Sequence, residues 1–505
     1  MYTVKGICML TTSMRDNNIA VERKFNSYVI ESLYSTMPYC NYNREILKMR
    51  IAEGLKLKME LYNICSAAKI AFPERDEILW ANNISEFSAK AATISILNQE
   101  PTVEQRSMKA FTMYALKGIA TFMYQVMKLG YDDLGIHTFI QSVISDITQR
   151  SISHSEWFDL VMLTGQYSMR SLSLLNKANT EKFGQPQFTQ VNLTTRNKPG
   201  ILVCGSDIKA LKELLEQSQE KGVDIYTTSE MVAAHAYPEI RKFSHLAGNY
   251  GGSWSSQREV FPAFHGPILF ASGSLIPPSL EFSYKERIFT TNVNGCPGCR
   301  HIGEDSQGKR DFSELIECAK EYRAPASLER GCINVGMAYN SLKYVSSSIL
   351  NALNTQDITH LTVIVGSDGR SAMWDFYEKV AKSCPISTLV LCAGDIKYRF
   401  NKERFGYVNG IPRLIDAGQI NDIFSIIELL LDMKNTLHVN DINKLPVSFY
   451  ASMHDPCSMA TLLALISLGI KGIRVGPLNA PPFCTEKMLK WLNTPKYSSS
   501  QIAYP

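Results

Sequence analysis

Hydrophobic residues recur every three or four positions from the start of the chain to about residue 198, which places them on one face of a helix. The spacing is clearest in residues 111–122 and 139–147. Chain-breaking residues are sparse in this part, and Ser155 and Asn179 stand where helix caps or turns are expected. Residues 1–197 are therefore predicted to form a helical bundle domain.

The pattern changes after Pro199, where short β-rich runs end in small or polar residues and lead into helical stretches. The runs are residues 200–207, 223–226, 267–271, 361–366, 388–392, 447–451 and 473–476. Strands that alternate with helices indicate parallel sheets covered on both faces. At 505 residues the chain is long enough for about three domains. We therefore expect an α plus α/β fold, with parallel-sheet domains at 198–345 and 346–505.

Polar residues follow several of the predicted strands. They are Ser206, Ser274, Ser367, Asp395 and Asp455, with Glu230 shortly after the strand that ends at Tyr226. Ligands of open parallel sheets bind at the carboxyl ends of the strands, near a switch in strand order. These residues are the first candidates to line a site. Since Ser and Asp are also preferred helix caps, a capping role is the alternative for each of them.

Charge and composition narrow the class of protein. The net charge is +4 without a long Lys/Arg run, so nucleic acid is not an expected partner. No run of about 18 apolar residues is present, and the N-terminus lacks a signal-peptide core, which predicts no membrane insertion. The 12 dispersed cysteines suit free thiols in a reducing compartment. We expect a cytoplasmic protein, with organelle or cytoskeletal association left open.

One segment, residues 303–309, has the spacing of a phosphate-binding loop. Arg310 stands where such a loop needs Ser or Thr for magnesium, and Glu304 and Asp305 would repel phosphate. No strand is predicted directly before Gly303. A solvated loop is therefore the prediction.

Cys296 and Cys299 form a C-x₂-C pair with His301 close behind. Structural zinc takes four ligands, usually from two such pairs, and the sequence has no second pair. Two free cysteines in a turn are expected, and zinc is the alternative.

Longer stretches of the chain carry a resemblance to a known family. They are Gly200–Asp207, Gly222–Thr227, Gly248–Trp254, Arg287–Thr291, Lys397–Asn401, Gly410–Gln419, Leu468–Pro477 and, in the helical half, Tyr114–Ala120. Through them the chain resembles the hybrid-cluster proteins, also called hydroxylamine reductases or prismane proteins, which are relatives of the carbon monoxide dehydrogenases. The resemblance implies a helical domain of two bundles and two Rossmann-like domains. Members of this family carry a cubane iron–sulfur cluster and a mixed iron–sulfur–oxygen cluster, and reduce hydroxylamine or nitric oxide.

The resemblance also implies that most cluster ligands are missing here. Of four N-terminal cysteine positions, two precede the start of this sequence, Tyr2 takes the third, and Cys8 alone matches. At the second cluster, Ser206 stands for a histidine, Glu230 for a retained glutamate, Asp455 for a glutamate and Cys457 for a lysine, while the four cysteine positions hold Ser274, Ser367, Asp395 and Ile420. Because thiolates hold iron–sulfur clusters, we expect vestigial sites, no cofactor and no hydroxylamine reduction.

Three functions remain open. The favoured one is a catalytically degenerate homologue that acts as a structural or protein-interaction component of a larger assembly, with homo-oligomers left open. Residues 38–44 include two tyrosines and are either a contact point for a partner or a simple loop.

The other two functions use the pocket. Glu230, Asp395 and Asp455 are candidate ligands of a hard, non-iron–sulfur metal, with Cys457 as a nucleophile whose pKa falls at a helix start. Alternatively, the vacated cavity binds a small molecule. If the pocket is vestigial, we expect side chains such as Ile420, or ordered water, to close it.

Overall fold

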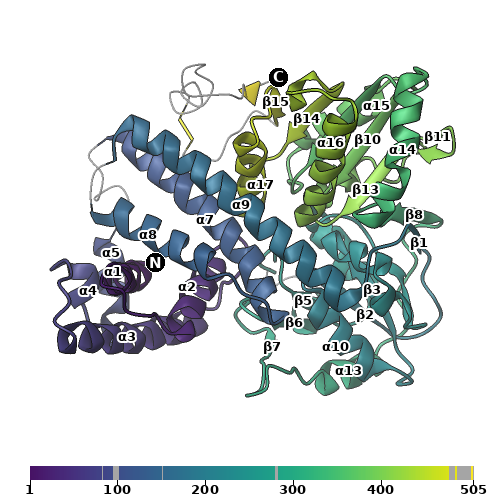
Figure 1. The fold of residues 1–505 in the computed structure, drawn as a ribbon. Helices are drawn as coiled ribbons and strands as arrows, with labels where there is room; N and C mark the ends of the chain where they lie inside the picture. The colour runs from purple at the N-terminus through teal and green to yellow at the C-terminus, as the bar shows by residue number, and fades with distance from the viewer. Residues whose placement is uncertain are drawn as a thin grey trace.

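Helices are the elements that the structure describes up to Phe183, as predicted, while β1 (Thr189–Asn192) lies at the end of the range 1–197 that was predicted as helical (Figure 1). The computed structural model describes residues 1–81, 83–94, 102–149, 152–278, 283–476, 484–485 and 502–503. The helices are α1 (Tyr2–Asp16), α2 (Arg23–Ser35), α3 (Arg44–Ala67), α4 (Asp76–Leu79), η1 (Ile84–Glu86), α5 (Phe87–Thr93), α7 (Val103–Lys128), α8 (Leu134–Gln149) and α9 (His154–Phe183). Helix α9 continues through Ser155 and Asn179, and the Ser153 side chain caps it. The predicted caps or turns at Ser155 and Asn179 were therefore wrong.

The first α/β part contains a parallel sheet of six strands in the order β4-β3-β2-β5-β6-β7. The strands are β2 (Gly200–Gly205), β3 (Asp224–Thr228), β4 (Leu246–Asn249), β5 (Ile268–Ala271), β6 (Ile288–Thr291) and β7 (Arg300–Ile302). Helical segments between and after them are α10 (Ile208–Ser218), η2 (Ser229–Ala236), α11 (Pro238–Arg241), η3 (Trp254–Ser256), α12 (Gln257–Phe264), η4 (Lys285–Arg287) and α13 (Ser313–Lys320). Numbered from β2, this order is 3-2-1-4-5-6, that of a Rossmann fold.

The second α/β part repeats the same order, β13-β10-β9-β14-β15-β16, again with parallel neighbours. Its strands are β9 (His360–Val365), β10 (Thr388–Ala393), β13 (Leu414–Gly418), β14 (Val447–Ala451), β15 (Ile473–Val475) and β16 (Ile502–Ala503). Its helices are α14 (Asn340–Asn354), η5 (Ala372–Trp374), α15 (Asp375–Ser383), η6 (Asp395–Arg399), η7 (Ile420–Asp422), α16 (Ile423–Thr436), η8 (Ile442–Lys444) and α17 (Pro456–Ser467). The two-sheet α/β prediction is confirmed, while the domain borders at 197/198 and 345/346 stay predictions.

Two small antiparallel pairs complete the described strands: β1 (Thr189–Asn192) with β8 (Cys332–Val335), and β11 (Tyr407–Val408) with β12 (Ile411–Pro412). The β1–β8 pair joins the chain just after α9 to the chain just before α14. It therefore connects segments that flank the whole first sheet.

Helix α17 connects the second sheet to the helical part. It packs against α7 and α9, and the residues from Pro456 to Ile466 are buried. Glycines permit the close approach: a Cβ at Gly118 would lie 2.1 Å from the Pro456 carbonyl oxygen, and one at Gly165 would lie 2.2 Å from the Leu463 carbonyl oxygen. Its apolar sequence therefore serves an internal interface. Within the described residues, no helix combines the length and the hydrophobicity that a membrane crossing requires.

Candidate functional site

Both sheets reverse their strand order at the same kind of place, between β2 and β5 in the first and between β9 and β14 in the second. The segments that follow these strands line one cavity of about 540 Å³. Ligands of open parallel sheets bind at such switch points, outside the carboxyl ends of the strands. The cavity therefore lies where two sheets each present a binding edge.

The eight positions that the resemblance relates to the second cluster all line this cavity. They are Ser206 after β2, Glu230 after β3, Ser274 after β5, Ser367 after β9, Asp395 after β10, Ile420 after β13, and Asp455 and Cys457 around the start of α17. The chain thus brings together residues that are up to about 250 positions apart in the sequence. Their relation to a lost cluster stays a prediction.

Asp395 and Asp455 are engaged in hydrogen bonds that hold the backbone around the cavity. Asp395 accepts from the Asp368 N–H at 2.9 Å, and also from the Ser229 hydroxyl at 3.0 Å and the Trp254 N–H at 3.3 Å. It thereby joins the second sheet to loops of the first. Asp455 caps α17, because it accepts from the N–H groups of residues 457 and 458 and from the Ser458 hydroxyl at 2.6 Å.

Glu230 is the carboxylate with the fewest such contacts. One of its oxygens accepts from the Ile420 N–H at 3.1 Å. Burial, with the negative charges of Asp395 and Asp455 nearby, raises its pKa well above the ordinary range. Burial and neighbouring Asp368 likewise raise the pKa of Asp395. Among the described residues that line the cavity, none is a lysine or arginine.

The three carboxylates do not form a metal site in this arrangement. No three His, Cys, Asp or Glu side chains are placed to hold one ion in the described part of the chain, whether around the cavity or elsewhere. Each carboxylate instead bonds to a different part of the surrounding backbone. The geometry weighs against a repurposed carboxylate metal site.

The cysteines of the cavity do not fit the family's iron–sulfur cluster. Cys40, Cys204 and Cys457 line the cavity, and all are buried. Burial raises the pKa of Cys40 to about 12, and that of Cys204 well above its ordinary value. A bound metal deprotonates the thiols that ligate it, so the identity of the side chains matters more than these pKa values. Of the eight matched positions only Cys457 carries a thiol, and the others hold hydroxyl, carboxylate and isoleucine side chains, which are a poor donor set for an iron–sulfur cluster.

The pKa of Cys457 is raised, although a lowered pKa was expected. The residue lies in the first turn of α17, where a helix dipole would lower a thiol pKa. Burial, followed by the charges of Asp455 and Glu230, instead raises its pKa well above the ordinary value. The prediction that its pKa falls was wrong, because desolvation and two carboxylates outweigh the helix terminus.

Tyr2 and Cys8, the residues matched to the family's first cluster, both lie on α1. Cys8 is fully buried, and this burial raises its pKa above the ordinary range. The Tyr2 hydroxyl donates to the Asp76 carboxylate, which also contacts Lys90. Both side chains are therefore part of the packing around α1.

Sequence reasoning missed the aromatic residues of the cavity. Tyr34, Tyr39 and Tyr114 come from the helical half, while Trp254 follows β4. Tyr39 packs on Trp254 with 5.2 Å between ring centroids, and the Tyr114 hydroxyl donates to the His454 carbonyl oxygen at 2.7 Å. Tyr114 and Trp254 lie inside the matching stretches 114–120 and 248–254, which is the signal that singles them out.

The 38–44 loop binds the chain's own first sheet domain. Tyr42 N–H donates to the Gly295 carbonyl oxygen at 2.7 Å, and Leu275 N–H donates to the Tyr39 carbonyl oxygen at 2.7 Å. Tyr39 is 39% exposed and Tyr42 is partly buried. The loop is therefore an internal contact that forms part of the cavity wall.

The cavity is open in spite of its isoleucine. Ile420 is buried and lines the space without filling it. The expectation that side chains close the pocket was therefore wrong. The alternative, ordered water, stays a prediction.

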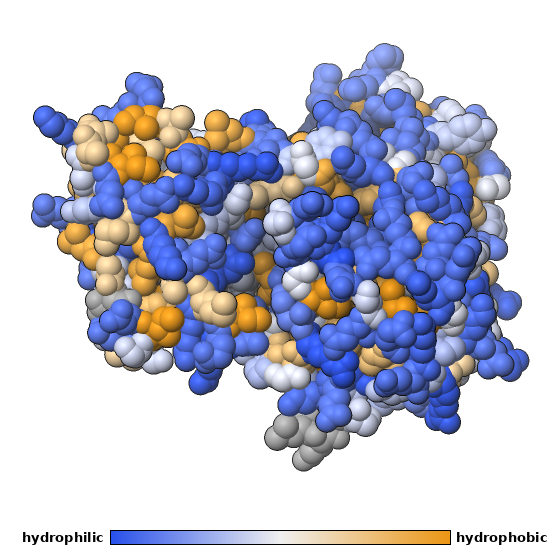
Figure 2. Space-filling view, turned by 90° about the horizontal axis from the view of Figure 1, so that it is seen from below, coloured by the Kyte–Doolittle hydropathy of each residue, from blue (hydrophilic) through white to orange (hydrophobic). Residues whose placement is uncertain are grey.

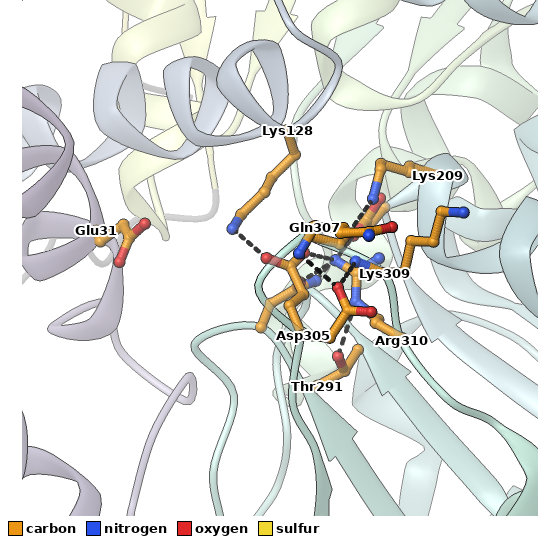
Figure 3. Close-up of polar contacts among 12 residues, drawn as sticks. Glu31, Lys128, Lys209, Thr291, Asp305, Gln307, Lys309 and Arg310 are labelled. Carbon is orange, nitrogen blue, oxygen red and sulfur yellow. Dashed lines mark hydrogen bonds and ion pairs between the residues drawn. The ribbon is translucent and has the colours of Figure 1, made fainter. Parts of the chain in front are cut away.

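None of the residues of the phosphate-loop-like segment lines the cavity. The segment lies near Lys128, the last residue of α7 (Figure 3). Strand β7 ends at Ile302, directly before Gly303, so the expectation that no strand precedes this segment was wrong. The segment nevertheless binds its own carboxylate: Asp305 accepts from the N–H groups of Gln307 and Lys309 at 2.8 and 2.9 Å. A bound phosphate would need these same amides.

A buried ionic cluster follows this loop (Figure 3). The Arg310 side chain is 0% exposed and pairs with Asp207, Glu213 and Glu304 at 3.3, 2.7 and 2.7 Å. Lys128, at the end of α7, reaches Glu304 at 2.6 Å. The loop therefore joins the helical part to the first sheet through charges.

Comparisons with known proteins agree with this fold. A sequence model described as "Prismane/CO dehydrogenase family" matches residues 1–498. Proteins named hydroxylamine reductase are similar: that of Porphyromonas gingivalis is 37% identical over 97% of this chain and 89% of its own length. That of Bacteroides thetaiotaomicron is 38% identical over 94% of this chain and 87% of its own length.

Solved structures show the same fold at low sequence identity. Carbon monoxide dehydrogenase IV from Carboxydothermus hydrogenoformans aligns with a TM-score of 0.57 and 14% identity, covering 100% of this chain and 85% of that chain. A subunit of acetyl-CoA synthase/carbon monoxide dehydrogenase aligns with a TM-score of 0.60 and 12% identity, covering 100% and 80%. With the match of the family model over nearly the whole length, these findings place the chain: it belongs to the Prismane/CO dehydrogenase family.

Proposed function

We propose that this chain is a catalytically degenerate member of its family that holds no iron–sulfur cluster and serves as a structural or protein-interaction component of a larger assembly. The observation that carries the proposal is the donor set of the cavity. Of the eight matched ligand positions only one, Cys457, holds a thiol, and the others hold hydroxyls, carboxylates and an isoleucine. The proposed role therefore departs from the activity named for the similar hydroxylamine reductases.

The former site now supports the framework. Asp395 bridges the two sheet domains through hydrogen bonds, and Asp455 caps the helix that joins the second sheet to α7 and α9. Such contacts preserve the folded shape without any cofactor. A protein that acts through its surface needs this shape and not the redox chemistry.

Helices α3, α4 and η1 offer apolar surface to a partner. Met49, Met59, Leu79 and Ile84 are 70%, 45%, 54% and 49% exposed. Figure 2 shows hydrophobic side chains on the helical side of the molecule, in groups separated by hydrophilic ones. Exposed hydrophobic groups with a polar rim are typical of protein contacts.

Size-exclusion chromatography of native extract tests the assembly. The protein should elute well above its 56.7 kDa monomer mass, and Met49→Glu combined with Leu79→Glu should shift it toward the monomer. Tyr344→Glu with Ile386→Glu is the matched control, because these side chains are 86% and 77% exposed in the second α/β part. A wild-type monomer without partners, or equal effects of both double variants, would contradict the proposal.

A second candidate function is the binding of a small molecule, and the open cavity favours it. A volume of about 540 Å³ lies within the usual range for ligand pockets. Its wall combines the aromatic side chains of Tyr39, Tyr114 and Trp254 with several polar groups. Such a wall is typical of ligand sites.

Native mass spectrometry of gently purified protein tests the second candidate. A bound ligand should appear as a discrete added mass that Ile420→Trp removes, since the larger ring enters the cavity. Ile386→Trp, on the surface, should leave the added mass in place. Protein without any added mass, or a mass that both variants retain, would remove this candidate.

A further inference from the structure

The Cys296–Cys299 turn lies outside the cavity and has no part in the proposed function. It connects β6 to β7, with Pro297 and Gly298 at its centre. The Cys299 N–H donates to the Cys296 carbonyl oxygen at 3.1 Å, and Gly298 has φ of +76°. Proline followed by a glycine with positive φ is the signature of a type II turn, which brings its first and fourth Cα atoms within about 7 Å. Disulfides span about the same Cα separation.

The two cysteines influence each other across the turn. Cys299 lowers the pKa of Cys296 in spite of its burial, while Cys296, together with burial, raises the pKa of Cys299. The Cys296 thiol also lies 3.9 Å from the Pro297 carbonyl oxygen. Lys285 lies beside the turn and favours a thiolate at either sulfur. Cys296 is buried and Cys299 is partly exposed, so a small reagent has access to the pair.

The surroundings do not complete a zinc site. His301 follows the pair, but its ring nitrogen bonds to the Thr290 hydroxyl at 3.0 Å. No set of three His, Cys, Asp or Glu side chains suited to a metal occurs among the residues that the structure describes. The turn therefore places the two cysteines at a separation that a disulfide can span, and the further ligands that structural zinc requires are missing among the described residues around it.

We propose that Cys296 and Cys299 form a thiol–disulfide exchange site that reacts with small disulfides. After the pair loses a proton to solvent, the thiolate attacks one sulfur of the disulfide RSSR. The S–S bond breaks, and RS⁻ leaves and takes up a proton from water. The second cysteine loses its proton and attacks the protein sulfur of the mixed disulfide, which releases the other RS⁻, and this RS⁻ also takes up a proton. Two electrons pass to RSSR, giving a Cys296–Cys299 disulfide and two RSH.

The pair is linked to the cavity wall through the residues directly before it. Gly295 accepts from the Tyr42 N–H at 2.7 Å, and the Asn294 side chain donates to the Cys40 carbonyl oxygen at 3.1 Å. Cys40 lines the cavity. These bonds are the route by which oxidation of the pair would reach the cavity wall.

Equilibration of the whole protein in glutathione buffers of increasing oxidised fraction tests the exchange site. Acid quenching, alkylation and mass spectrometry should show Cys296 and Cys299 lost together as an internal disulfide. The exposed Cys332 is the internal control and should form only a glutathione adduct. In Cys296→Ser, the remaining Cys299 should become a glutathione adduct. Both cysteines remaining thiols where Cys332 is fully modified, or one zinc per chain retained by the pair, would overturn the proposal.

Hydrogen exchange of the unmodified protein tests the link to the cavity wall. The Tyr42 amide should exchange roughly tenfold faster in the oxidised protein than in the reduced one, because its bond to Gly295 weakens. Peptides from α16 are the internal control and should exchange alike in both forms. Equal exchange at Tyr42 would overturn the link.

Discussion

The sequence suggested the carboxyl group of Glu230 as a metal ligand. In the folded protein its surroundings favour the neutral form of this group. Burial is the largest cause of its raised pKa, and the charges of Asp395 and Asp455 add to it. In the unfolded chain the same group titrates near 4.5. The stabilisation of its neutral form is therefore complete below about pH 4.5 and is lost as the pH rises through the higher pKa of the folded state.

Replacement of Glu230 by Gln should remove this pH dependence. Urea unfolding between about pH 4 and 8 should show the free energy of unfolding falling less steeply with pH in Glu230→Gln than in the wild type. Glu216→Gln, at a side chain 55% exposed on α10, is the control and should follow the wild type. If the free energy of unfolding changes with pH in the same way in Glu230→Gln and in the wild type, the fold does not stabilise the neutral form of Glu230.

Arg310 tests the buried ionic cluster at the same scale. Arg310→Met leaves Asp207, Glu213 and Glu304 without their shared cation, and should lower the free energy of unfolding by about 3–5 kcal/mol. Arg300→Met removes a pair whose arginine is 45% exposed and should cost about 0–1 kcal/mol. Similar losses for both variants in denaturant unfolding would show that the cluster does not stabilise the domain.

The sequence predicted the positions of several site residues but not the environment of their side chains. Ser206, Asp395 and Asp455 were found as strand-end residues from pattern alone, and they do line the cavity. The pKa of Cys457 was predicted in the wrong direction, because its burial and its neighbour Glu230 depend on segments more than 200 residues apart. The local sequence indicates that Cys457 lies at a helix start, but it does not show which distant residues bury the thiol.

The predicted strand bounds agree closely with the observed ones where the hydrophobic runs are long. Strands β2, β9 and β14 were predicted within one or two residues of their ends. Strands β4, β6, β7, β13 and β16 were missed, and none of them has more than five residues. Strands β4 and β7 also include Gly248 or the exposed Arg300 and His301. Runs this short carry too few alternations to stand out.

Asp455 caps the start of α17. If Asp455 serves as a helix cap, Asp455→Ala should lower the free energy of unfolding by about 1 kcal/mol. Asp455→Asn keeps a good cap and should stay close to the wild type. Thermal and denaturant unfolding of both variants decide this, and an equal loss for Asn and Ala would indicate that the charge matters instead of the cap.

At the scale of the whole molecule, the main feature is the meeting of two sheets with the same strand order at one cavity. Sequence patterns predicted both sheets and the residues at their ends. They did not predict that the 38–44 loop and the aromatic residues of the helical half would form the opposite wall, since such contacts arise only when the domains pack together. The open cavity was likewise not predictable from Ile420 alone.

Metal analysis decides whether the chain keeps the family's fold without holding its clusters. The protein should be purified without oxygen, incubated with iron and sulfide, desalted, and assayed for iron, acid-labile sulfide and visible absorption. The hydroxylamine reductase of Bacteroides thetaiotaomicron, treated in parallel, controls for the procedure. We predict a colourless protein with iron and sulfide at background. A brown protein that retains stoichiometric iron and sulfide, with a broad charge-transfer band, would contradict the account.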